Sequence, residues 1–111
     1  MMEEKVNKDL IEEKADDEEV VEEKEKVWTL KDVLKYVNRS KYRVRTIKAI
    51  GKNVKMPKEI ARDSGILPNH ISNVLRQLRE KDVVECLNPD MRKGRLYRLS
   101  ERGLKILEKL E

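Results

Sequence analysis

Two stretches before residue 52 carry hydrophobic residues at helical spacing. In the first, one helix face holds Leu30, Val33, Leu34 and Val37, at positions i, i+3, i+4 and i+7. Thr29 and Asp32 form a capping-box pattern at its start, and Ser40 is a second N-cap signal. The apolar positions behind Ser40 are Tyr42, Val44, Ile47 and Ile50, and Gly51 is a typical helix stop. The pattern therefore predicts two short helices between Thr29 and Gly51.

The next stretch predicts a pair of helices joined by a tight turn. Val54 to Met56 is expected to be extended, because the residue before Pro57 avoids helical angles. A short helix over Lys58 to Asp63 follows, with Ile60 and Ala61 facing inward, and it is broken at Ser64-Gly65. Pro68 fits the first position of the next helix, which is expected to run to about Lys81. The apolar stripe of this helix consists of Ile71, Val74, Leu75 and Leu78.

The pattern then changes from helical spacing to that of a hairpin. Val83 to Leu87 and Arg95 to Leu99 are predicted strands, with Asn-Pro-Asp turn residues at 88–90 between them. Ser100 caps a last helix, in which Leu104, Leu107 and Leu110 recur at a spacing of three. The predicted fold class is mainly α with a small β-hairpin (α+β), formed by residues 27–111.

Residues 1–26 lack such periodicity, and their charge is opposite to that of the rest of the chain. They carry 12 acidic and 5 basic side chains, whereas residues 27–111 carry 10 acidic and 21 basic ones, for a net charge of +4. The first segment is predicted to be an acidic tail, either disordered or a frayed, solvated helix. A basic domain attracts polyanions, and the acidic tail is hypothesised to compete for its basic face. The alternative is an ordinary lysine-rich surface.

Composition argues against several classes of protein. The single cysteine, Cys86, forms no internal disulfide, and no apolar run is long enough to cross a bilayer, so a cytoplasmic protein without a membrane anchor is expected. Cys86 is interpreted as a small packed hydrophobe, with redox sensing as the alternative. One cysteine and one histidine on different elements predict neither a metal site nor a cofactor. The sequence contains neither a nucleophile–base arrangement nor a phosphate-binding glycine loop, so we do not expect an enzyme.

The polar face of the helix from Pro68 has residue types that bind base edges in DNA. Opposite the apolar stripe lie Asn69, Ser72, Asn73 and Arg76, flanked by His70 and Gln77. Asn and Gln suit adenine, Arg suits guanine and Ser suits either. The alternatives are an ordinary solvated helix face and, for His70, simple exposure in the first turn. At the predicted hairpin turn, Arg92, Lys93 and Arg95 around Gly94 suit a phosphate backbone or a narrow minor groove. The alternative is a plain basic loop.

Three segments of the chain, within residues 40–110, resemble winged helix-turn-helix transcription regulators of the broad group that includes the MarR-like and ArsR-like proteins, with archaeal members closest in style. These segments are KEIARDSGI, HISNVLRQLREKDVVECLNPD and RKGRLYRLSERG. The resemblance implies a winged helix-turn-helix domain, here with an extra N-terminal helix. It also implies that helix 68–81 enters the major groove of double-stranded DNA and that a wing at 88–95 contacts the backbone or minor groove. The predicted DNA-binding residues are Pro68, Asn69, His70, Ser72, Asn73, Arg76, Gln77, Arg92, Lys93 and Arg95.

Two residues depart from the family pattern. Leu67 stands where a capping Ser, Thr or Asp is usual, and Asp82 stands where the family often has Gly, although Asp tolerates left-handed angles. The resemblance further implies a homodimer. The candidate pairing surfaces are the helix at Thr29 to Val37 and the last helix. The alternative is that both helices only cover their own core. The sequence shows no effector signature. The alternative function is a protein-interaction or RNA-binding module.

Overall fold

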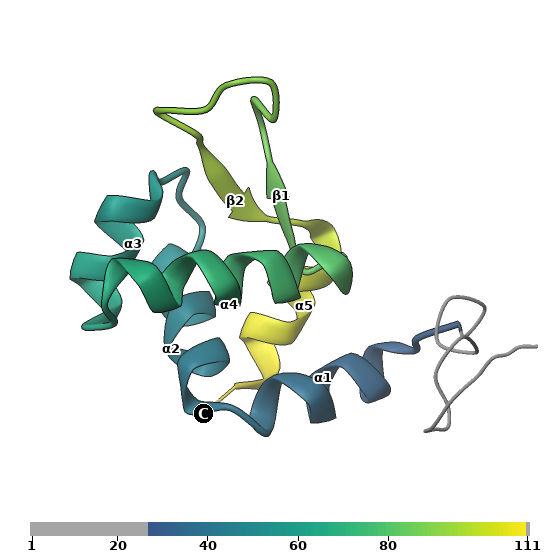
Figure 1. The fold of residues 1–111 in the computed structure, drawn as a ribbon. Coiled ribbons are helices and arrows are strands. Elements are labelled where there is room, and N and C mark those ends of the chain that lie inside the picture. The colour runs from purple at the N-terminus through teal and green to yellow at the C-terminus, as the bar shows by residue number, and fades with distance from the viewer. Residues whose placement is uncertain (1–26, 111) are drawn as a thin grey trace, which may run out of the picture.

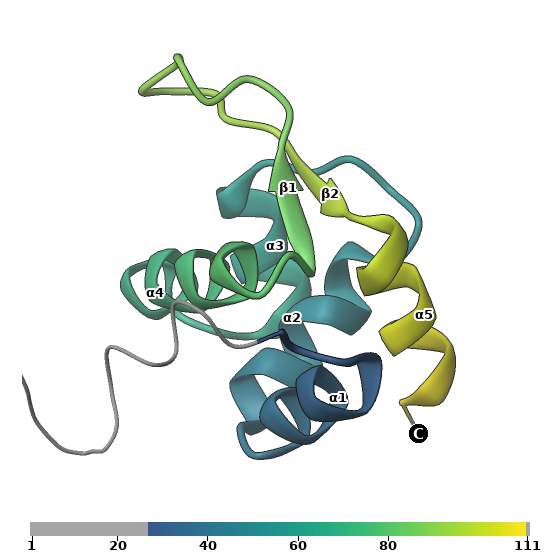
Figure 2. The same cartoon turned by 90° about the vertical axis from the view of Figure 1, so that its right-hand side faces the viewer.

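The computed structural model describes residues 27–110, so the predicted acidic tail lies outside the described residues. The elements are α1 (Leu30–Asn38), α2 (Lys41–Ile50), α3 (Pro57–Ser64), α4 (Pro68–Glu80), β1 (Val84–Cys86), β2 (Tyr97–Leu99) and α5 (Glu101–Lys109). The antiparallel hairpin of β1 and β2 rises beside α4, and α1 and α5 lie toward the opposite side of the helical body (Figure 1). Figure 2 shows the loop between the strands projecting beyond the helices. The predicted mainly α fold with a small hairpin is confirmed.

Side-chain caps fix the starts of three helices as the sequence predicts. The Thr29 hydroxyl accepts a hydrogen bond from the Asp32 amide at 3.1 Å, and the Asp32 carboxylate accepts one from the Thr29 amide at 3.2 Å. The Ser40 hydroxyl accepts from the Arg43 amide at 3.4 Å. The Ser100 hydroxyl accepts a hydrogen bond from the Gly103 amide at 3.0 Å. Each cap satisfies a backbone donor that has no partner within its own helix.

The turn between α3 and α4 combines a left-handed glycine with a cap from another helix. Gly65 has φ +71°, and its amide donates to the Ala61 carbonyl at 3.0 Å. Arg45 on α2 donates two hydrogen bonds to the Ser64 carbonyl, at 3.0 and 2.7 Å, and one to the Gly65 carbonyl at 3.1 Å. A cation at the carboxyl end of a helix also interacts favourably with the helix dipole. Arg45 therefore helps to fix the direction in which the chain leaves α3 and enters α4.

One hydrophobic core joins the helices, and it includes the whole predicted stripe of α4. Its fully or nearly fully buried members on the first four helices include Val33, Val37, Ile47, Ile50, Ile60, Ile71, Val74, Leu75 and Leu78. Burying one such side chain stabilises the fold by about 1.5–3 kcal/mol. Because the stripe of α4 faces this core, the opposite face of α4 is turned to solvent.

The buried face of α5 differs from the one that leucine spacing suggests. Ile106 and Gly103 are buried, whereas Leu104 is 37% exposed. The reason lies in the close approach of α5 to the residues before β1. A Cβ atom on Gly103 would overlap the carbonyl oxygen of Val83, so only glycine permits this distance. The approach turns Ile106 toward the core.

The hairpin is shorter than predicted, with three residues in each strand. Glu85 pairs with Arg98 in the register, and their side chains form an ion pair at 2.6 Å. Lys55, in the predicted extended stretch before α3, also pairs with Tyr97, through backbone hydrogen bonds of 2.9 and 2.8 Å. Asp82, between α4 and β1, has φ +61°, which is the left-handed conformation that the resemblance led us to expect at this position. The arrangement is a winged helix-turn-helix with an additional helix, α1, at its start.

Candidate nucleic-acid interface

A groove of about 520 Å³ separates α4 from the loop of the hairpin, residues 88–95, which we call the wing. Helix α4 contributes Ser72, Asn73, Leu75, Arg76 and Arg79, and the wing contributes Arg92, Gly94 and Arg95; Pro57 and Tyr97 also line the groove. This α4–wing groove therefore brings together five of the ten residues predicted from sequence to bind DNA: Ser72, Asn73, Arg76, Arg92 and Arg95.

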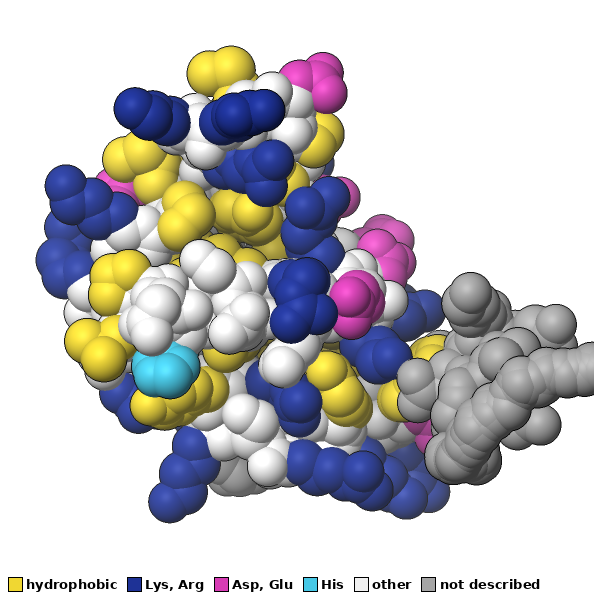
Figure 3. Space-filling view, in the orientation of Figure 1, with side chains coloured by type: hydrophobic (Ala, Val, Ile, Leu, Met, Phe, Trp, Pro, Cys, Tyr) yellow, Lys and Arg dark blue, Asp and Glu magenta, His cyan; other side chains and the backbone are white. Residues whose placement is uncertain are grey.

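Positive charge dominates the α4–wing groove. Among the residues that line it, four are arginines and none is acidic. In Figure 3, Lys and Arg side chains run from the wing down across one end of α4, and hydrophobic side chains lie between wing and helix. The remainder of the front face of α4 is mainly uncharged and polar. A concave cationic surface beside uncharged hydrogen-bonding groups suits a ligand with a polyanionic backbone and polar edges.

Arg76 lines this surface from α4 and has one weak partner. Its guanidinium lies 3.4 Å from the Glu80 carboxylate, one helical turn away, and both side chains are more than half exposed. An exposed pair of this kind contributes only about 0.3–0.5 kcal/mol. The Arg76 side chain is therefore easily redirected toward a ligand in the groove. Ser72 donates to the Pro68 carbonyl at 3.3 Å, within its own helix, and Asn73 is exposed.

The predicted residues at the edges of α4 have different surroundings. Pro68, Asn69 and His70 are exposed at its amino-terminal end, outside the lining of the groove. The ring of His70 lies 5.6 Å from that of Tyr42 on α2. Gln77 is half-buried, and its side-chain oxygen accepts a hydrogen bond from Arg43 at 3.2 Å. Gln77 thus links α4 to α2. It lies at the flank of the polar face of α4, on the side that faces α2.

The wing is braced from within by two side chains. The amide oxygen of Asn88 accepts from the Leu96 backbone amide at 2.8 Å, while its nitrogen donates to the Gly94 carbonyl at 3.1 Å. Arg95 donates to the Met91 carbonyl at 2.6 Å and to the Pro89 carbonyl at 3.2 Å. Gly94 has φ +69°, which closes the turn. The wing therefore has a defined shape before any ligand binds.

The three cations of the wing consequently differ. Arg95 is half-buried, and its guanidinium is held by backbone carbonyls, although it still lines the α4–wing groove. Arg92 and Lys93 are exposed, and within residues 27–110 no hydrogen bond or ion pair engages either side chain. Arg92 lines the α4–wing groove, whereas Lys93 lies beyond it. Arg92 is therefore the wing residue best placed to contact a ligand in the groove.

Arg79 lines the α4–wing groove but is absent from the residues predicted from sequence. The signal for it was present, because Arg79 follows Arg76 by three positions and residues at that spacing share a helix face. It was missed because the selection centred on the direction opposite the apolar stripe, whereas the wing lies to one side of that direction.

An acidic residue on α3 is neutralised by its neighbours. The Asp63 carboxylate accepts hydrogen bonds from Lys55 at 2.7 Å and from Arg62 at 3.1 Å. These hydrogen bonds, that from Lys55 first, hold the pKa of Asp63 below its ordinary value. The carboxylate therefore stays charged and paired, and it opposes an approaching polyanion less than an unpaired acid would.

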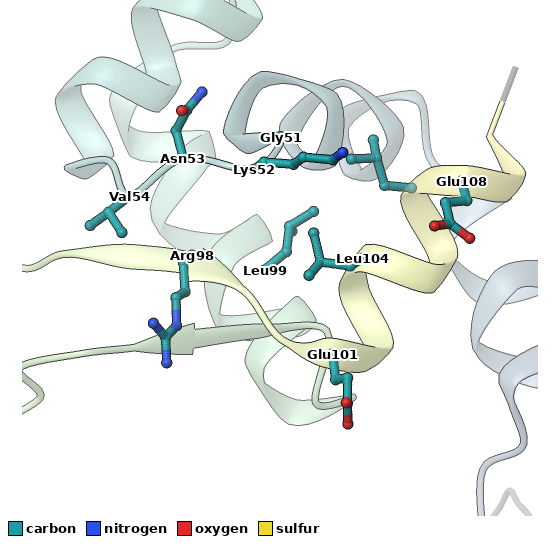
Figure 4. A pocket seen from close by; sticks show the side chains of 10 residues that line it. Gly51, Lys52, Asn53, Val54, Arg98, Leu99, Glu101, Leu104 and Glu108 are labelled. Atoms are coloured by element: carbon teal, nitrogen blue, oxygen red, sulfur yellow. The ribbon is translucent and has the colours of Figure 1, made fainter.

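A second concavity, of about 760 Å³, lies beside α5 and contains none of the predicted site residues. Its lining includes Leu99, Leu104 and Leu107, together with Lys52 and Glu108. In Figure 4, Leu99 and Leu104 lie close together between the loop at 51–54 and α5, while the tips of Arg98 and Glu101 point away from them. Within residues 27–110, no His, Cys, Asp and Glu side chains gather as a metal site. None of the described helices is long and apolar enough to cross a membrane.

Comparison with known proteins identifies similar folds. No family model matches the sequence, and no curated protein does. Solved structures match 72% of the chain: NadR in complex with 4-hydroxyphenylacetate (TM-score 0.57, 22% identity), ligand-free NadR (0.56, 20%) and a double mutant of Lactococcus lactis ZitR in its apo form (0.51, 14%). The matched parts cover 58%, 57% and 60% of those chains. The chain thus shares their fold and spans less than two thirds of their length.

Proposed function

We propose that the chain is a DNA-binding transcription regulator. The observation that supports it most is that Ser72, Asn73 and Arg76 of α4 line the same groove as Arg92 of the wing. In this proposal the amino-terminal half of α4 enters the major groove, where its amide and hydroxyl groups contact base edges. The wing contacts the backbone or the minor groove through Arg92 and Lys93. The helix positions the base-reading residues, and the wing supplies affinity that does not depend on sequence.

Arg92→Ala is expected to weaken binding to every duplex by a similar factor. Since Arg92 is assigned to the backbone or minor groove, its loss removes about one released counterion, so the plot of log affinity against log salt flattens by about one. Fluorescence anisotropy with random and selected duplexes at several salt concentrations measures both effects. Lys105→Ala is the matched control, because it removes one exposed positive charge from α5. A change confined to one duplex sequence, or an equal effect of the control, contradicts the assigned role.

The alternative functions are RNA binding and docking in a larger protein assembly. The uncharged polar groups of α4 next to the cationic groove favour DNA over pure docking, because a duplex offers both phosphates and base edges. Gel-shift competition separates the possibilities. Preference for duplex DNA over single-stranded RNA and heparin supports the proposal, whereas equal competition by all three indicates a nonspecific polyanion surface.

Pairing of two copies forms the second part of the proposal. Both candidate helices cover their own core, since α1 buries Val33 and Val37 and α5 buries Ile106. Leu104 and Val54, which are 37% and 47% exposed and line the same concavity, favour α5 as the pairing surface. We expect sedimentation equilibrium at micromolar concentration to give twice the mass of the chain and Leu104→Glu to shift it toward a single copy. A single-copy mass for the unmodified chain would remove two-fold symmetry from the proposed DNA site.

A further inference from the structure

Leu67, the residue immediately before α4, has an exposed side chain that contributes little to the fold. It occupies the N-cap position, where its side chain makes no capping hydrogen bond. It is also 64% exposed, so it loses most of the stabilisation that burial of a leucine provides. A Ser or Thr at an N-cap typically favours folding by about fivefold relative to an apolar residue. Leu67 is therefore unfavourable for the start of the helix and gains little from packing.

The surroundings of Leu67 connect it with the proposed DNA interface. Its backbone carbonyl accepts hydrogen bonds from the amides of His70 and Ile71, each at 3.0 Å, which fixes Leu67 to the first turn of α4. Pro68 and Asn69, which follow it, are exposed. His70, in the first turn of α4, lies on the face that carries the α4–wing groove (Figure 3). Leu67 is thus an exposed apolar residue at the amino-terminal end of α4, two positions before the exposed Asn69.

The major groove of DNA presents one apolar group that a leucine side chain can contact. This group is the C5-methyl of thymine, while the other features of the base edges are hydrogen-bond donors and acceptors. The amino-terminal residues of a helix placed in the major groove are the ones that reach base edges. Asn69, Ser72 and Asn73 suit the polar features, which leaves the methyl group as the chemically matched partner of Leu67.

We propose that Leu67 recognises a thymine methyl group in the major groove. This inference rests on the proposed function, because it requires that α4 enters the groove of a duplex. It adds a base preference that hydrogen bonding does not provide. It also explains why an exposed leucine stands where a capping residue would stabilise the helix, since functional sites often retain residues that are unfavourable for the fold.

Replacing thymine by deoxyuridine tests the inference, because the exchange removes only the methyl group. The probe is the duplex recovered from a random library by the full-length protein, with its thymines replaced one at a time. For the unmodified protein we expect at least one replacement to weaken binding by about three- to fivefold, the value for one buried methyl group. For Leu67→Ser we expect no weakening at that position, together with a higher midpoint of thermal unfolding. Leu67→Met, which stays apolar, should retain the discrimination.

Val27→Ser is the control, because Val27 is an exposed apolar residue before α1, outside the lining of the α4–wing groove, and it should leave the discrimination unchanged. Indifference of the unmodified protein to every replacement would overturn the inference while leaving the proposed function intact. Retention of the full discrimination by Leu67→Ser would also overturn it and would assign Leu67 to another contact, such as a second copy of the chain. Failure of the unmodified protein to bind any duplex would overturn the proposed function itself.

Discussion

Gly103→Ala is expected to destabilise the domain by about 1–3 kcal/mol, although alanine is the better helix former. Gly103 is buried in α5, where a Cβ atom would overlap the Val83 carbonyl oxygen and lie 3.1 Å from the Cβ of Leu99. The Val83 oxygen is part of the backbone, and it accepts hydrogen bonds from the Ser100 amide at 2.9 Å and hydroxyl at 3.1 Å. It cannot move without disturbing the cap of α5 and the base of the hairpin. Urea denaturation followed by circular dichroism measures the change.

Gly94→Ala provides the control for this substitution. Gly94, unlike the helical Gly103, has positive φ, +69°, and no atom lies within 4 Å of the place that a Cβ would occupy. Its substitution should therefore carry only the backbone cost of a left-handed alanine, about 1 kcal/mol. A Gly103→Ala protein as stable as the unmodified one would show that α5 does not approach Val83 as closely as described.

Arg76→Ala is expected to lower affinity for the selected duplex by about fivefold to 150-fold, which corresponds to about 1–3 kcal/mol. Arg76 lies in the α4–wing groove and is held only by its exposed pair with Glu80, so little energy is needed to turn it toward a guanine edge. The loss should be concentrated at one base pair. Affinity for random duplex should fall much less than affinity for the selected one. Titration of a set of duplexes, each with one altered base pair, measures this preference.

Two variants make the Arg76 experiment specific. Arg39→Ala removes an exposed arginine from the end of α1, outside the groove, and should change affinity only slightly. Glu80→Ala removes the partner of Arg76 and should leave affinity unchanged or raise it. An Arg76→Ala protein with the same base preference as the unmodified chain would contradict the role assigned to Arg76 in reading bases.

Local signals in the sequence were sufficient to predict the helices and the polar face of α4. The caps at Thr29, Ser40 and Ser100 depend on neighbours within three residues, and the structure confirms them. The apolar stripe of α4 has a 3.6-residue period, so its exposed face followed directly from the sequence. Each of these features is determined by a few consecutive residues or by the period of one helix.

Contacts between segments that are far apart in the chain could not be predicted from the sequence. Arg43 bonds to Gln77, 34 positions away, and Arg45 caps α3 from α2. A long side chain on a helix surface has many possible partners, and periodicity does not distinguish them. The brace that Arg95 provides within the wing was missed for the same reason, since a cation in a basic loop equally suits an external phosphate. On α5, leucine spacing missed Ile106, because the helix orientation depends on the contact at Gly103.

The most direct test of the central claim is to locate the duplex on the protein. The claim is that the α4–wing groove binds double-stranded DNA, and backbone amide chemical shifts of the chain can be followed by NMR as a selected duplex is added. The predicted result is that the largest shift changes fall on Asn69 to Arg79 and on the wing, with α1 and the exposed face of α5 little changed. Large changes on α1 or α5 without changes in α4 and the wing, or no changes at all, would contradict the claim.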